Sequence, residues 1–232
     1  MTSSIEIPLS KLPYFDPSQV PILGVDSHLP AVGLDVLQPA ALRLRFATLP
    51  AWEPEVWAEK SFSDRTPTQA AVLVPIVMRE QPTVLLTERT KHLSNHSGQI
   101  AFPGGKADKE DADASATALR EAEEEIGLDP ALVDVLGVLP HYVTGTAFII
   151  TPVIALVQPG FALNPNGYEV ADVFEVPLEF LMNPSHHRRH AFEWEGVRRE
   201  WFSMPYQDKS AQRFIWGATA GMLRNFYRLL SA

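Results

Sequence analysis

Three glutamates near the middle of the chain have the type and spacing to bind a divalent cation. Glu121, Glu124 and Glu125 are spaced so that in a helix their side chains would fall within about 100° of one another. Like charges at these spacings each cost roughly 0.2 to 0.5 kcal/mol, and a bound cation would offset that repulsion. Because the chain has no cysteine, the ligands must be oxygen or imidazole, and carboxylate oxygen suits Mg²⁺ or Mn²⁺.

A glycine turn, Phe102-Pro103-Gly104-Gly105, precedes these glutamates. Glycine has no Cβ, so a backbone carbonyl in such a turn can approach a metal closely. A run of glutamates by itself is most often a solvated helix face. The turn just upstream makes a metal site the better interpretation here.

The glutamates are expected on a helix from Asp113 to Ile126, with Asp113 as the N-cap and Gly127 ending the helix. Leu119 and Ala122 would share with Ile126 an apolar stripe that packs beside the anionic one. Short β-branched and aromatic runs around this helix predict strands, so strands and helices interleave. The predicted strands are residues 71–77, 83–87, 99–102, 133–139, 148–157, 170–176 and 199–204, and a last helix is predicted at 216–230.

Residues 1–69 are expected to form an N-terminal extension, and residues 70–232 the main domain, with its core starting at Ala70. The extension is rich in proline and has one helix candidate at residues 39–47. On that interpretation Leu44 would lie on the shared apolar face, while alternation of Leu42, Leu44 and Phe46 leaves a strand as the alternative.

The composition excludes several classes of partner. The net charge of -9 argues against broad electrostatic binding to nucleic acid or to anionic lipid. No apolar run approaches the roughly 20 residues that a membrane helix needs, and the N-terminus lacks the pattern of a secretory signal. We therefore expect a cytoplasmic protein with no nucleic-acid or membrane partner, and a homodimer stays open.

The stretch from Arg120 to Leu128 resembles the signature of the Nudix hydrolases. That signature is a glycine, five residues, a glutamate, seven residues, then Arg-Glu-aliphatic-any-Glu-Glu-any-Gly-aliphatic. The second half matches, with Ala122 at an aliphatic position. The first half departs, because Gly105 to Arg120 is 15 positions where the signature has 14, and Asp111 stands in place of the early glutamate. The resemblance implies a Nudix α/β/α sandwich with a mixed sheet.

By this resemblance, Glu121, Glu124 and Glu125 would bind Mg²⁺ or Mn²⁺, and the Gly104 carbonyl would complete the metal shell. Arg120 would orient the glutamates by ion pairing. The metal would neutralise a diphosphate, polarise its phosphorus and make water a usable nucleophile near neutral pH. The implied reaction is hydrolysis of a diphosphate linkage.

The segment from Leu85 to Gly105 resembles an additional motif, that of the coenzyme A pyrophosphatase branch of the Nudix family. Arg89, Gly98 and the turn at 102–105 fit this motif, whereas Ser94 replaces a second arginine. The blocks at 151–153, 169–178 and 215–222 also resemble the branch. The resemblance implies hydrolysis of coenzyme A or its derivatives to 3',5'-ADP and a 4'-phosphopantetheine product.

Arg89, with Gly104 and Gly105, is predicted to bind the substrate. A guanidinium at the end of a strand and close to the glycine turn is placed to donate to phosphate oxygens. The alternative for Arg89 is a surface ion pair with Glu88 or Asp108.

The general base is expected among glutamates on or outside the helix, and only geometry decides between them. Glu169 precedes a predicted strand and is the candidate on a later loop, with Glu124 as its main rival. Glu175 is expected to cap a strand instead. The basic cluster from His186 to His190 is expected to be a solvated loop, with a phosphate or an acidic partner patch as the alternative.

Two alternatives to coenzyme A hydrolysis remain at this point. The carboxylate helix alone would equally permit an ADP-ribose or other nucleoside-diphosphate-linked pyrophosphatase. A non-catalytic nucleotide-binding Nudix module is the alternative from another class, although the intact Glu121, Glu124 and Glu125 argue against it. In each case the partner is a small-molecule diphosphate.

Overall fold

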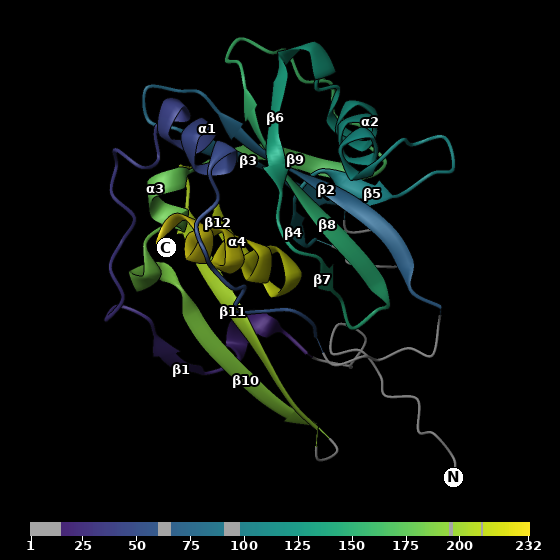
Figure 1. The fold of residues 1–232 in the computed structure, drawn as a ribbon. Helices are drawn as coiled ribbons and strands as arrows, with labels where there is room; N and C mark the ends of the chain where they lie inside the picture. The colour runs from purple at the N-terminus through teal and green to yellow at the C-terminus, as the bar shows by residue number, and fades with distance from the viewer. Residues whose placement is uncertain (1–14, 60–65, 91–97, 195–196, 210) are drawn as a thin grey trace.

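The computed structural model describes residues 15–59, 66–90, 98–194, 197–209 and 211–232 (Figure 1). In this part of the chain the strands form a larger sheet of eight strands and a smaller sheet of four. None of the helices found there is long and apolar enough to cross a membrane.

The helices and 3-10 helices are η2 (Pro17–Gln19), α1 (Pro39–Ala47), α2 (Ala114–Ile126), η3 (Pro130–Leu132), α3 (Leu178–Leu181), η4 (Pro184–His186) and α4 (Gly217–Leu230). The strands are β1 (Ile22–Val25), β2 (Thr68–Val77), β3 (Thr83–Arg89), β4 (Ile100–Ala101), β5 (Gly104–Lys106), β6 (Val133–Val138), β7 (Tyr142–Val143), β8 (Phe148–Val157), β9 (Val170–Pro177), β10 (Arg188–Trp194), β11 (Val197–Gln207) and β12 (Gln212–Trp216).

The larger sheet is mixed, as predicted. Its two longest strands, β2 and β8, run parallel along their whole length, while β3, β5 and β6 pair antiparallel with their neighbours. β5 pairs with β2, so Gly104 lies opposite Val72. β9 pairs with β3, so Val170 lies opposite Arg89. The sheet therefore brings the start of β9 beside the end of β3.

Helices cover the larger sheet from two sides, α2 on one face and α4 on the other (Figure 1). The alternating side chains of β2 divide between these layers. Leu73 belongs to the same core as Ala122 of α2, and Val74 to the same core as Leu223 of α4. Since β2 is buried on both faces from Ala70 onward, its sequence is apolar from Ala70 to Val77 rather than alternating. The α/β/α sandwich is confirmed.

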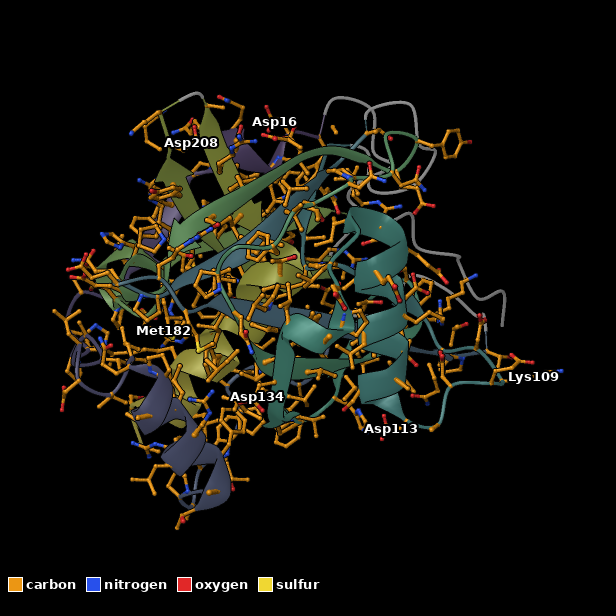
Figure 2. All side chains as sticks on the ribbon, turned by 90° about the horizontal axis from the view of Figure 1, so that it is seen from above. Asp16, Lys109, Asp113, Asp134, Met182 and Asp208 are labelled. Carbon is orange, nitrogen blue, oxygen red and sulfur yellow. The ribbon has the colours of Figure 1, made fainter. Side chains whose placement is uncertain are left out.

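The carboxylate helix α2 begins and ends where the sequence predicts. Asp113, labelled in Figure 2 at the start of α2, accepts a hydrogen bond from the Ala116 amide over 2.9 Å. Gly127 ends the helix in the left-handed conformation, with a φ of 68° that favours glycine. These two ends fix which turns of the helix carry the glutamates.

The smaller sheet contains strands that were not predicted, β1, β10 and β12. The expectation that His186 to His190 form a solvated loop is wrong, because most of this cluster lies in β10 and both His187 and His190 are buried. His190 Nε2 lies 2.8 Å from the Ser203 hydroxyl, and His187 Nε2 lies 2.8 Å from the Leu181 carbonyl. Burial lowers the pKa of His187 to about 4. These histidines are part of the packing.

The N-terminal segment contributes to the core. The helix at residues 39–47 is confirmed as α1, but Leu42 is its buried residue and Leu44 is exposed. The expectation that the core starts at Ala70 is wrong, since Leu37 and Leu42 belong to the core that includes α4. The extension thus shares a hydrophobic core with α4.

A buried arginine also connects this segment to α4. Arg224 has a side chain that is 1% exposed, and its Nε donates to Glu55 over 2.7 Å. A terminal nitrogen of Arg224 lies 3.0 Å from Asp26, and the other lies 3.0 Å from His187 Nδ1. Arg189 of β10 pairs with the same two carboxylates. Two arginines thus neutralise two acids that come from residues 26 and 55.

Candidate active site

Glu125 is the most buried of the three helix glutamates, with a side chain that is 8% exposed. Its Oε2 accepts a hydrogen bond from the Gly104 amide over 3.1 Å, and its Oε1 lies 3.6 Å from a terminal nitrogen of Arg89. Burial raises the pKa of Glu125 to about 7, because the carboxylate loses water and the charges of Glu121 and Glu169 lie near it. The structure therefore brings the helix, the glycine turn and the end of β3 together at one carboxyl group.

The raised pKa predicts a pH dependence of stability in the metal-free protein. Between about pH 4.5 and pH 7 the folded chain holds a proton on Glu125 that the unfolded chain has lost, so the free energy of unfolding falls as pH rises. Glu125→Gln has no carboxyl group to titrate at this position. The free energy of unfolding of the variant minus that of wild type should therefore increase by roughly 2 to 3 kcal/mol across that pH window. Denaturant titrations in EDTA at several pH values measure it. An advantage that does not change with pH would contradict the burial argument.

Glu121 lies directly over the glycine turn. A Cβ added at Gly105 would lie 2.5 Å from the Glu121 carboxyl carbon, so a larger residue there would displace this carboxylate. A Cβ at Gly104 would meet the Ala71 carbonyl oxygen at 2.5 Å, and its φ of 157° also favours glycine. Burial, and then the nearby charges of Glu124 and Glu169, raise the pKa of Glu121. Glycine is thus required at 104 by the approach of β2, and Gly105 leaves room for the Glu121 carboxylate.

Arg120 joins the loop after β5 to the glutamates. Its Nε and one terminal nitrogen donate to the two oxygens of Asp111 over 3.0 and 2.9 Å, and that second nitrogen also donates to the Lys106 carbonyl. The remaining nitrogen donates to Glu121 over 3.0 Å and to Glu124 over 3.2 Å. This pairing holds the pKa of the Asp111 carboxyl well below its usual range. Asp111, which stands where the signature has its early glutamate, is therefore the main partner of Arg120.

Glu124 differs from its two neighbours, because its side chain is 61% exposed and its described contact is with Arg120. Within the described residues, no three acidic or histidine side chains are grouped as a metal site. The carboxylates of Glu121 and Glu124 are directed to Arg120, and that of Glu125 to Gly104 and Arg89. The joint role of the three glutamates as metal ligands stays a prediction.

Glu169 lies close enough to the helix for its charge to affect the pKa of both Glu121 and Glu125. It immediately precedes β9, and the antiparallel register puts this end of β9 beside Arg89. Glu175 lies towards the opposite end of β9, where it accepts from Arg79 over 2.7 Å and from the Thr83 hydroxyl. The register thus separates the two later glutamates and brings only Glu169 to the site. Ser94, the departure from the second motif, lies outside the described residues.

The donor chemistry of these residues fits a hard divalent cation. Carboxylate oxygens and one backbone carbonyl are the ligand types that Mg²⁺ and Mn²⁺ prefer. The carboxyls of the half-buried Glu121 and the buried Glu125 also have raised pKa values in the absence of a cation, and a positive charge beside them would lower those pKa values again. The residues present therefore suit a metal-dependent reaction on a negatively charged substrate.

The chain belongs to the NUDIX domain family, whose model matches residues 67–204. It is a hydrolase of the class that acts on pyrophosphate bonds, and members of this class generally use divalent metals such as Mg²⁺ or Mn²⁺. The chain is 45% identical over 157 residues to the uncharacterized Nudix hydrolase NudL of Escherichia coli K12, which covers 67% of this chain and 79% of that protein. The NudL of Enterobacter sp. strain 638 is 44% identical over the same lengths. Among solved structures, a C. elegans Ap4A hydrolase complex matches 47% of this chain and 80% of its own, with 18% identity and a TM-score of 0.41.

Proposed function

We propose that this protein hydrolyses the diphosphate of coenzyme A or a coenzyme A derivative with Mg²⁺ or Mn²⁺, releasing 3',5'-ADP and a 4'-phosphopantetheine product. The observation that carries the proposal is the 3.6 Å approach of Arg89 to Glu125. Arg89 comes from the stretch that resembles the coenzyme A branch, and Glu125 comes from the carboxylate helix. The two motifs therefore contribute to one site, and the first is positioned to affect which diphosphate the second cleaves.

Each residue of this site has a distinct proposed role. The cation, when bound, supplies positive charge that neutralises the diphosphate and makes water more acidic. Glu121 and Glu125 would hold that cation together with the Gly104 carbonyl, and Glu124 would supply a further carboxylate oxygen. Arg120 fixes Glu121 through its pairing with Asp111. Arg89 donates to a phosphate oxygen, and a guanidinium suits that contact because its planar donors match phosphate geometry.

Glu169 is the proposed general base. Its carboxylate takes the proton of the attacking water as the new oxygen–phosphorus bond forms, and the bridging phosphorus–oxygen bond of the diphosphate breaks. The supporting observation is electrostatic, since the charge of Glu169 raises the pKa of both Glu121 and Glu125. Glu124 is the weaker candidate because it is held by Arg120 on the exposed side of the helix.

A substrate comparison tests the proposal. Purified protein is incubated with Mg²⁺ or Mn²⁺ and with coenzyme A, ADP-ribose or a deoxynucleoside triphosphate in parallel, and the products are identified by mass. We expect coenzyme A to give the highest kcat/KM, with 3',5'-ADP as a product. Preferred cleavage of ADP-ribose would replace coenzyme A by the alternative substrate class. Cation binding without turnover of any substrate would contradict the proposed reaction.

A further inference from the structure

The loop that carries Glu169 is fixed on one side to the end of the carboxylate helix. The Asn164 amide donates to the Ile126 carbonyl over 2.9 Å, and the Asn166 amide donates to the Glu125 carbonyl over 2.8 Å. The Asn166 carbonyl in turn accepts from the Glu169 amide over 2.9 Å. A short chain of backbone hydrogen bonds therefore runs from Glu125 through Asn166 to Glu169.

The same loop is fixed on its other side by Thr90. The Thr90 amide donates to the Glu169 carbonyl over 2.9 Å, which extends the pairing of β3 with β9 by one residue. The Thr90 hydroxyl donates to the Tyr168 carbonyl over 2.8 Å. Thr90 is 7% exposed, so water cannot readily replace this hydroxyl as the donor. It also follows Arg89 directly, so one short segment touches both Glu125 and the loop of Glu169.

We propose that the Thr90 hydroxyl is a positioning group for Glu169. The Thr90 hydroxyl donates to the carbonyl of the peptide bond between Tyr168 and Glu169, and the Thr90 amide donates to the carbonyl of the next peptide bond, so the two donors hold the backbone on both sides of the Glu169 Cα. Without the hydroxyl the peptide between Tyr168 and Glu169 keeps the hydrogen bond from the Glu169 amide to the Asn166 carbonyl but loses the one to the Tyr168 carbonyl, so the backbone that sets the direction of the Glu169 side chain is less constrained. A general base that moves by about 1 Å loses much of its effect. This inference rests on the proposed role of Glu169 as the base.

Two substitutions at Thr90 separate the hydroxyl from the size of the side chain. Thr90→Val keeps the branched shape and the backbone amide but removes the donor, whereas Thr90→Ser keeps the donor. We expect Thr90→Val to lower kcat about tenfold with KM changed less than about twofold, and Thr90→Ser to stay close to wild type. Coenzyme A and ADP-ribose, each with Mg²⁺, are the two probes, and melting temperatures are measured for every variant.

A double-mutant cycle with Glu169→Gln shows whether Thr90 acts through Glu169. If it does, adding Thr90→Val to Glu169→Gln costs nothing further, because the base that the hydroxyl positions is already gone. Losses that multiply, or an equal loss in Thr90→Ser, would overturn the positioning role while leaving Glu169 as the base. A Glu169→Gln variant with wild-type kcat would instead remove Glu169 from the proposed reaction, and the inference with it. If Thr90→Val does not fold, Thr90→Ala removes the same donor and is judged by the same outcomes.

Discussion

Glu125→Gln is expected to lower kcat/KM by roughly 10²- to 10³-fold, because Glu125 is a proposed ligand of the cation and the loss of such a ligand costs several kcal/mol of transition-state stabilisation. The amide has nearly the shape of the carboxyl group but carries no charge. It would keep one oxygen facing the Gly104 amide, which donates to Glu125 over 3.1 Å. The fold should therefore survive, and the metal-free variant should melt at the same temperature as wild type or higher. Steady-state kinetics with Mg²⁺ and thermal melts in EDTA measure the two effects.

The chain offers a matched control for this experiment in Glu123→Gln. Glu123 lies on the same helix and is exposed. Its substitution makes the same chemical change, from carboxylate to amide, but leaves the carboxyls of Glu121 and Glu125 in place. Its kinetics should match wild type. A large drop in melting temperature for Glu125→Gln, with activity lost only in proportion to unfolded protein, would show that Glu125 is structural.

Arg224→Met is expected to destabilise the protein by about 3 to 5 kcal/mol, the usual cost of removing one partner from a buried ion pair. Methionine fills part of the volume but leaves Asp26 and Glu55 with Arg189 as their common cation. It also removes the donor that faces His187 and the guanidinium that lies 5.1 Å from the centres of the Phe202 and Tyr227 rings. Denaturant titrations at neutral pH give the change in the free energy of unfolding.

The control for this loss is Arg228→Met on the same helix. Arg228 is exposed, so removing its charge should change the free energy of unfolding by less than about 0.5 kcal/mol. A loss below about 1 kcal/mol for Arg224→Met would mean that the ion pairs contribute little beyond what a packed methyl group supplies. In that case the N-terminal segment would depend mainly on apolar contacts such as those of Leu42.

The parts of the fold with strong local patterns were predicted from the sequence. α2 has an N-cap, a period of 3.6 residues and a glycine end, and β8 is an apolar run whose bounds match the prediction from Phe148 to Val157. β10 was missed because it begins with two arginines and its buried residue, His190, is polar. His190 is buried by pairing with Ser203 and the Val20 carbonyl, partners that are far away in the sequence. No local pattern reveals such pairing, so a strand with one buried histidine had the composition of a solvated loop.

The site shows the same division between local and long-range information. The helix glutamates, the glycine turn and Arg89 were identified from spacing and motifs, and the structure brings them together. The unequal burial of Glu124 and Glu125 follows from how α2 packs on β2, which spacing alone does not fix. Thr90 and Asn166 gave no signal, because their contacts run through the backbone of a loop that lies about 80 residues away along the chain from Thr90. The roles assigned to these residues stay predictions until the variants are measured.

The contacts of Arg120 have a consequence for how this framework can adapt. One guanidinium bridges the Lys106 carbonyl, Asp111 and two helix glutamates, so the loop after β5 cannot shift without disturbing α2. The loop after β5 and α2 are therefore expected to behave as one rigid unit. Rigidity suits charged groups that must keep a fixed spacing while the charge distribution of the substrate changes during the reaction. Accommodation of substrates of different size therefore falls to the surrounding segments. Changes in substrate preference among chains that share this framework should accordingly accumulate outside residues 104–125.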